Sequence, residues 1–236
     1  MTTTLVLLPG LAGDAEMWRE QLADLADWRP QVSDVHMRHA TVPEMAAAVL
    51  ARWPGSLALC GASMGGMLAM EVVRQAPERV AGLALLGTSA QPENDEMRRI
   101  RENAIELFAA GRVREVIEPN VGFAFHPRHA QDPALVRRYL DFVLAAGAEQ
   151  LVRQNRAVIA RPDARLHLPH VRCPTLVMAG LDDQLTPPDL AREIAGLVPG
   201  AELVLLPECG HMLTMEQPKR VNEELRRWLR RLQEAS

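Results

Sequence analysis

Lysine, aromatic residues and long apolar runs are all scarce in this sequence of 236 residues. Lys219 is the only lysine, and no run or stripe of arginines replaces the missing lysines, so a nucleic-acid partner is not expected. The apolar runs are the size of strands and fall far short of the roughly 20 residues that span a membrane. The opening MTTTLVLLPG lacks the basic start of a signal peptide, and we expect neither a signal peptide nor a membrane partner.

Cysteine is also rare. Cys60, Cys173 and Cys209 lie far apart and form no C-x-x-C motif. The odd count, without a signal peptide, favours reduced thiols and a cytoplasmic location. A hydrophobic fraction of 48% and a net charge of -4 suit one globular domain, or one domain that carries a large insertion.

Six of the seven histidines occur in H-x-x-H pairs, a spacing that can belong to a metal site. No pair has a cysteine or carboxylate partner at ligand spacing, and none matches H-E-x-x-H. We therefore predict no metal site and interpret the pairs as loop and surface residues: His36 and His39, His126 and His129, His167 and His170.

Strand-like and helical segments alternate along the chain. Several of the strand-like segments are nearly continuous apolar runs, which are typical of strands covered on both faces by helices. The alternation predicts an α/β fold with a parallel sheet and right-handed crossovers. The predicted strands are 3–10, 31–37 (the weakest), 56–61, 80–88, 173–180 and 201–208.

The alternation stops after the segment 80–88, and no convincing strand follows before residue 173. Residues 92–160 are mostly helical in pattern, and the connection is far longer than an ordinary loop. We interpret it as a helical insertion that forms a lid over one end of the sheet. Its charges are of both signs, which favours a solvated outer surface.

Residues 57–68, LALCGASMGGML, contain the pattern Gly61-x-Ser63-x-Gly65 between an apolar strand and a helix. So sharp a strand-to-helix reversal strains the central residue and needs small residues on both sides. It exposes the serine hydroxyl at the carboxyl end of the sheet, beside the N–H groups of a helix start. Ser63 is therefore a candidate nucleophile.

A serine nucleophile needs a general base and an acid that orients the base. His211 follows the last predicted strand, in LPECGHMLTMEQP, and is the candidate base. The loop after the preceding strand, MAGLDDQLTPP, offers Asp182 and Asp183, and bare chemistry does not choose between them. The order Ser, Asp, His is that of one hydrolase architecture.

These three motifs together resemble the α/β-hydrolase superfamily, in its lid-bearing serine esterase and lactonase-like branch. GLDDQLTPP is similar to the family's G-x-x-D-x-x-x-P segment and CGHMLTMEQP to its G-H-x-x-x-x-E-x-P segment. The resemblance selects Asp183 as the acid and implies a catalytic triad of Ser63, Asp183 and His211. It also implies the α/β-hydrolase fold, with about six mostly parallel strands flanked by helices. The core would be residues 1–90 and 169–236, with a lid at 91–168 inserted after the fourth strand.

The family pattern further implies an oxyanion hole made of two backbone N–H groups. One belongs to Met64, directly after the nucleophile, and the other to Leu11, in the loop after the first strand. Many family members have His-Gly at the start of that loop, where this sequence has Pro9-Gly10. Pro9 cannot replace a histidine side chain that anchors the loop, so the support of the loop must differ.

The resemblance predicts a serine hydrolase that cleaves a small to medium carboxylic ester, lactone or thioester through an acyl-enzyme, with no metal or organic cofactor. The alternatives are a non-hydrolytic reaction on the same triad, as in a lyase or perhydrolase, and a ligand-binding receptor or pseudoenzyme. A small molecule is the expected partner, and a homodimer is possible. Aromatic residues of the lid either line an apolar pocket or pack helices together: Phe108, Phe123, Phe125 and Tyr139.

Overall fold

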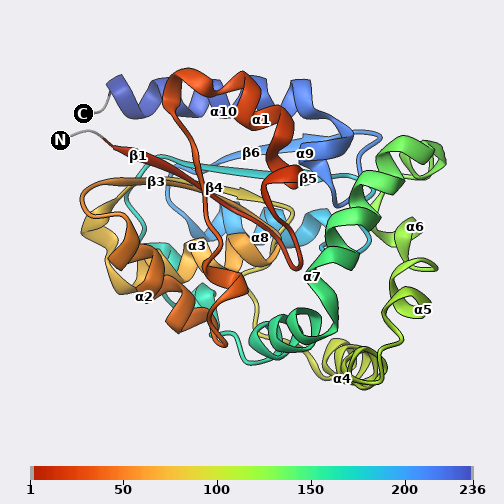
Figure 1. Ribbon diagram of the computed structural model, residues 1–236. Helices are drawn as coiled ribbons and strands as arrows, with labels where there is room; N and C mark the ends of the chain where they lie inside the picture. Colours follow the sequence, from red (N-terminus) through yellow and green to blue (C-terminus); the bar gives the residue numbers. More distant parts are fainter. Residues whose placement is uncertain (1–2, 235–236) are drawn as a thin grey trace.

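The computed structural model describes residues 3–234, which fold around one six-stranded sheet (Figure 1). The strand order is β2-β1-β3-β4-β5-β6, and all five pairings between neighbours are parallel. The predicted parallel sheet of about six strands is therefore confirmed. The strands are β1 (Thr4–Leu8), β2 (Gln31–Val32), β3 (Leu57–Ala62), β4 (Val80–Leu86), β5 (Thr175–Gly180) and β6 (Glu202–Leu206).

Both faces of the sheet are buried, as the continuous apolar runs predict. In β1, Leu5 and Leu7 belong to the apolar core on one face, and Val6 and Leu8 belong to the core on the other. Successive side chains of a strand point to opposite faces, so each central strand contributes to two cores.

Helices α1 and α10 contact each other on one face of the sheet, and α2, α3 and α8 cover the other (Figure 1). Across residues 3–234, no helix combines the length and apolar character needed to cross a bilayer. The helices are α1 (Arg19–Asp24), α2 (Val42–Arg52), α3 (Met64–Gln75), α4 (Asp95–Ala109), α5 (Val113–Ile117), α6 (Val121–Ala124), α7 (Pro133–Ile159), α8 (Pro188–Leu197), α9 (Leu213–Glu216) and α10 (Pro218–Glu234). Short 3₁₀ helices cover Ala15–Trp18, Ala26–Trp28, Val35–Met37, Pro77–Arg79, His129–Gln131, Ala164–Leu166 and Leu168–His170.

The segment between β4 and β5 is helical, as predicted, and we call residues 91–168 the helical insertion. Its helices α4 to α7 gather beyond one end of the sheet (Figure 1). The backbone N–H groups of His211 and Met212 donate to the carbonyl of Ala124, at 3.0 and 3.1 Å. Since these two residues follow β6, the insertion lies against the loops at the carboxyl ends of the strands.

The aromatic residues of the insertion pack mainly against one another and the core. Phe108 and Phe125 are buried in the core that contains Leu5 and Leu7, and Tyr139 contacts Phe125 edge to face at 5.3 Å between ring centroids. Phe123 is 48% exposed. Helix packing therefore accounts for Phe108, Phe125 and Tyr139.

The second strand is shorter than predicted. The segment 31–37 forms a strand only over Gln31–Val32, and residues Val35–Met37 turn into a 3₁₀ helix. The strand lies at the edge of the sheet and pairs only with β1. Val35 and His36 are buried through this turn rather than through strand pairing.

Candidate active site

Ser63 occupies a strained turn between β3 and α3. Its φ of 53° lies in the left-handed region that a non-glycine residue rarely adopts. A Cβ on Gly61 would lie 2.2 Å from the carbonyl oxygen of Gly65, and one on Gly65 would lie 1.9 Å from that of Leu8. Only glycine fits at these two positions, so the predicted elbow is present and both glycines are required for it.

Backbone contacts hold the elbow in place. The N–H of Ser63 donates to the carbonyl of Leu86 at 2.9 Å, and the hydroxyl of Thr88 donates to the carbonyl of Ser63 at 2.7 Å. Both partners come from β4 or the residues directly after it. The serine is therefore fixed at the carboxyl end of the sheet, next to the point where the strand order reverses between β1 and β3.

The side chains of Ser63, His211 and Asp183 form one chain of hydrogen bonds. Ser63 Oγ lies 2.9 Å from His211 Nε2, and His211 Nδ1 lies 2.8 Å from Asp183 Oδ2. The residues come from three loops that follow β3, β5 and β6. These contacts join residues 148 and 28 positions apart in the sequence, and they bring together all three side chains that the motifs select.

The partners of His211 determine which nitrogen carries the proton. The Asp183 carboxylate can only accept, so His211 Nδ1 carries the hydrogen. In the neutral ring, Nε2 then has a free lone pair that accepts the hydrogen bond from the Ser63 hydroxyl. This is the tautomer that a general base needs in order to take a proton from serine.

Burial and charge shift the pKa of each residue of this pair, His211 and Asp183, in opposite directions. Burial lowers the pKa of His211, but the charge and hydrogen bond of Asp183, together with the charge of Glu216, outweigh burial and raise the pKa above its ordinary value. Burial likewise raises the pKa of Asp183, and the His211 charge together with several hydrogen bonds brings it below its ordinary value. The geometry therefore favours an ionised Asp183 beside a basic imidazole.

The structure distinguishes the two aspartates of the loop after β5. Asp183 is 3% exposed, whereas the side chain of Asp182 is 44% exposed and lies 3.9 Å from His126 Nε2. The Oδ1 of Asp183 accepts from the N–H groups of Leu185 and Thr186, at 2.9 and 2.8 Å. Together with the two contacts of Oδ2, these bonds occupy the four acceptor positions of the Asp183 carboxylate.

Thr186 is a member of the site that the motifs did not identify. Its hydroxyl donates to Asp183 Oδ2 at 2.7 Å, and its oxygen lies 3.1 Å from His211 Nδ1. The threonine stands three residues after Asp183, a spacing at which a side chain can turn back onto a carboxylate. This spacing is the feature of the sequence from which Thr186 could have been identified.

Glu216 holds the loop that carries His211. Its buried carboxylate accepts from the N–H groups of Gly210 and Met212, which flank His211, at 3.0 Å each. It also accepts from the N–H of His126 at 2.8 Å and lies 2.9 Å from His129 Nδ1. The glutamate of the G-H-x-x-x-x-E-x-P segment thus joins the His211 loop to the helical insertion.

The two residues selected for the oxyanion hole lie on either side of the elbow. Met64 is the first residue of α3, so its N–H has no acceptor within its own helix. Leu11 lies in the loop after β1, and its neighbour Gly10 is so close that a Cβ there would lie 3.2 Å from Ser63 Cβ. The structure therefore brings the Leu11 loop and the start of α3 to the same serine.

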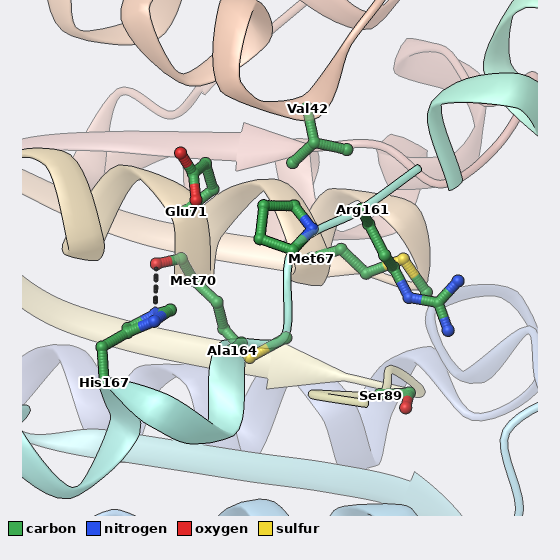
Figure 2. Close-up of a pocket in the computed structure, with 9 residues that line it drawn as sticks. Val42, Met67, Met70, Glu71, Ser89, Arg161, Ala164 and His167 are labelled. Atoms are coloured by element: carbon green, nitrogen blue, oxygen red, sulfur yellow. Dashed lines mark hydrogen bonds between the residues drawn. The ribbon is translucent and has the colours of Figure 1, made fainter. Parts of the chain in front are cut away.

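A small cavity lies away from these residues, between α2, α3 and the chain that leaves the helical insertion. Figure 2 shows Val42, Met67 and Ala164 around it, with His167 Nε2 at 3.0 Å from the carbonyl oxygen of Met70. Ser63, Asp183 and His211 do not line it. In the part of the chain that the structure describes, no cluster of three or more histidine, cysteine or acidic side chains could hold a metal ion.

Comparisons with known proteins relate the whole chain to one fold. The model of the family described as alpha/beta hydrolase fold matches residues 32–218. The chain is 29% identical to a thermophilic esterase of Thermogutta terrifontis, solved with malate bound, with a TM-score of 0.88 over 98% of this chain and 90% of that one.

Two curated relatives are also similar. The acetyltransferase component (dihydrolipoyllysine-residue) of an acetoin cleaving system from Pseudomonas putida is 31% identical over 97% of this chain, which spans only 64% of that protein. A pimeloyl-[acyl-carrier protein] methyl ester esterase of Nitrosomonas europaea is 26% identical over 76% of this chain and 73% of its own length. The family model covers most of the chain, and the structure has the strand order and elbow described above. The chain therefore belongs to the family of proteins with the alpha/beta hydrolase fold.

Proposed function

We propose that this protein is a serine hydrolase that cleaves a small to medium carboxylic ester, lactone or thioester through an acyl-enzyme on Ser63. The observation that carries the proposal is the continuous contact from Ser63 Oγ through the His211 ring to Asp183, at 2.9 and 2.8 Å. The esterases among the similar proteins support ester bonds as the class of substrate.

The first half of the reaction is acyl transfer to the enzyme. His211 Nε2 takes the proton of Ser63 as its oxygen attacks the substrate carbonyl. The imidazolium that forms is stabilised by the ionised Asp183. His211 then gives the proton to the leaving alcohol or thiol. The bond between the carbonyl carbon and the leaving group breaks, and the acyl group stays bonded to Ser63.

The second half is hydrolysis. A water molecule gives a proton to His211 Nε2 and attacks the acyl carbonyl, and the collapse of the intermediate returns the proton to Ser63. In both halves, negative charge develops on the carbonyl oxygen. We assign the N–H groups of Leu11 and Met64 to this oxygen, where one such donor is typically worth about 3 kcal/mol of transition-state stabilisation.

The helical insertion acts as a lid in this proposal. Its Ala124 carbonyl accepts from the N–H of His211 and its His126 N–H donates to Glu216, so it borders the loop that carries His211. Because its position over the site limits the space for the acyl and leaving groups, we assign the choice of substrate to the insertion and the chemistry to the core.

Activity-based labelling with a fluorophosphonate, combined with hydrolysis of p-nitrophenyl acetate, tests this function. The wild-type protein is expected to take one label, on Ser63, and to hydrolyse the ester. Ser63→Ala is expected to lose both, with a fall in kcat of at least about 10³-fold. Ser56→Ala is the matched control because Ser56 lies in the loop before β3, away from the elbow, and it is expected to keep wild-type activity.

Mass spectrometry with a slowly hydrolysed ester tests the covalent intermediate. An acyl adduct on Ser63 is the expected result. Labelling of Ser63 and conversion of substrate without an adduct would favour a lyase on the same side chains. Full ester hydrolysis by Ser63→Ala would overturn the assignment of the nucleophile, and ligand binding without any turnover would indicate a receptor.

A further inference from the structure

The loop after β1 has one internal hydrogen bond, from the N–H of Gly13 to the carbonyl of Gly10 at 3.0 Å, and it contains a strained residue. Leu11 is followed by Ala12, whose φ of 58° lies in the left-handed region that a non-glycine residue rarely adopts. Such a conformation costs about 1–3 kcal/mol and persists only where neighbouring groups impose it. Pro9, at the start of the loop, has no side-chain polar atom and no N–H that could hold it.

Gln154, on α7 of the helical insertion, supplies this support. Its Oε1 accepts a hydrogen bond of 2.7 Å from the N–H of Ala12, 142 residues away in the sequence. The side chain of Gln154 is fully buried, at 0% exposed. Since a backbone N–H can only donate, the atom facing Ala12 must be the amide oxygen, which fixes the orientation of the amide.

The other end of the same amide contacts a second support of the loop. Gln154 Nε2 donates to the carbonyl of His36 at 3.2 Å, and His36 Nε2 lies 2.8 Å from the carbonyl oxygen of Gly13. Burial lowers the pKa of His36, which favours the neutral ring. A carbonyl can only accept, so the neutral ring carries its hydrogen on Nε2. Ala12 and Gly13 are thus held by the side chains of Gln154 and His36, and the Gln154 amide also contacts the backbone of His36.

The segment of α7 around Gln154 is itself anchored. Gln150 Nε2 donates to the carbonyl of Met37 at 2.9 Å, and Arg153 donates to the same carbonyl. One turn further on, Val158 is buried in a small apolar cluster with Met64 and Met67, against which Leu11 packs. The same helix therefore contributes to the apolar cluster that contains Met64 and against which Leu11 packs.

We propose that Gln154 is a positioning residue that holds the Leu11 N–H in place for the oxyanion, and that it makes the helical insertion a structural part of the catalytic apparatus. This inference rests on the proposed function. The hydrogen bond from the N–H of Ala12 to Gln154 fixes the peptide next to Leu11. Its loss leaves Ser63, Asp183 and His211 in place and lets the loop after β1 relax from its strained conformation.

Gln154→Leu tests the inference, because leucine is of similar size and has no acceptor for the Ala12 N–H. With p-nitrophenyl acetate, kcat is expected to fall on the order of 10- to 100-fold while KM changes by less than about threefold, since donors that stabilise the oxyanion act in the transition state. Affinity for a boronic acid that mimics the tetrahedral intermediate is expected to fall in parallel with kcat/KM.

Gln150→Leu is the matched control. It lies one turn earlier on α7 and loses its hydrogen bonds with Met37, Arg153 and the Nε2 of Gln154, the last a long one of 3.5 Å. The Oε1 of Gln154, which accepts from Ala12, keeps its partner in this variant. The variant is expected to lower the melting temperature about as much as Gln154→Leu and to keep wild-type kcat. Should Gln154→Leu be poorly folded by circular dichroism, Gln154→Met, with the same expected pattern, replaces it.

The possible failures can be told apart. Wild-type kcat and boronic acid affinity in a folded Gln154 variant would overturn the positioning role while Ser63→Ala still abolishes turnover. Equal losses of kcat in the Gln150 and Gln154 variants would also overturn it, since this would indicate a general effect of destabilising α7. Retention of activity in Ser63→Ala would instead overturn the proposed function.

Discussion

At the scale of single residues, the proposed mechanism depends on the proton that His211 carries. Only the neutral ring can accept the Ser63 proton, and Asp183 stabilises the charged ring. Asp183 therefore raises the pKa of His211 against the effect of burial and at the same time makes the imidazole a stronger base. The same interaction removes the active form at acidic pH.

We expect kcat/KM to fall on the acidic side with a midpoint above 6.5, the ordinary pKa of histidine. The fall follows protonation of His211, so activity is present above the midpoint and lost below it. The pH dependence of ester hydrolysis, together with imidazole NMR signals assigned through His211→Gln, measures this. A midpoint at or below 6.5 would contradict the net rise in the pKa of His211.

Asp183→Asn is expected to lower the NMR midpoint of His211, since burial then acts without the charge of Asp183. It is also expected to lower kcat on the order of 10⁴-fold, because an amide no longer fixes the tautomer. Asp182→Asn is the control, since the Asp182 side chain is 44% exposed and contacts neither Ser63 nor His211. An unchanged titration in Asp183→Asn would refute this account.

The sequence predicted Ser63, Asp183 and His211 because each stands in a local motif beside a recognisable strand. Thr186 and Gln154 could not be selected in the same way. Thr186 is one of several small polar residues near the elbow and its loops, and Gln154 is one of several polar residues on a long helix. Thr186 has a local spacing to Asp183 that many loops share, whereas the contact of Gln154 with Ala12 spans 142 residues and has no local pattern.

At the scale of elements, the close approach of β1, β3 and α3 determines the shape of the elbow. The start of α3 lies so near the end of β1 that Gly65 would overlap Leu8 if it carried a Cβ. The apolar runs and glycines predicted this strand-turn-helix unit correctly. The edge strand was predicted too long, because the apolar residues of 31–37 also suit a buried 3₁₀ turn and only pairing with a neighbour distinguishes the two.

Gly65→Ala is expected to destabilise the fold by more than about 3 kcal/mol, above the usual range for overpacking, because backbone atoms of Leu8 cannot rotate away. Urea denaturation followed by circular dichroism measures this. Gly196→Ala in α8 is the matched control, since a Cβ there meets nothing within 4 Å. It is expected to be neutral or to stabilise by up to about 1 kcal/mol through helix propensity. Equal stability of the two variants would contradict the steric explanation.

At the scale of the whole molecule, the sheet separates two apolar cores, and α10 closes one of them. Trp228 of α10 is fully buried and donates through its Nε1 to the carbonyl of Pro174 at 3.0 Å. Gly82 on β4 leaves room for it, since a Cβ there would lie 2.9 Å from the Trp228 ring and 2.5 Å from Leu232. The amphipathic pattern of the last helix predicts its presence, but not this fit between an indole and a glycine of the sheet.

Trp228→Ala is expected to cost about 3–5 kcal/mol of unfolding free energy, a large share of the stability of a typical domain. A lower urea midpoint, with a single transition preserved, is the expected measurement. Trp53→Ala serves as the comparison because Trp53 is half-buried and stacks with Arg52, and about 1 kcal/mol is expected there. A Trp228 variant as stable as the Trp53 variant would contradict the central place of α10.

Gly147 divides α7 into two rods that run in different directions (Figure 1). Its φ of 79° and ψ of 168° are open to glycine and almost nothing else, and a Cβ there would meet no atom within 4 Å. The inner rod carries Gln150 and Gln154, and the outer rod carries Tyr139 and Phe142. Under the proposed function, the part of α7 before Gly147 borders the bound acyl group and the part after Gly147 supports the loop after β1. Because the kink separates these two parts, we expect substitutions before Gly147 to alter the choice of substrate and to leave the contact between Gln154 and Ala12 in place.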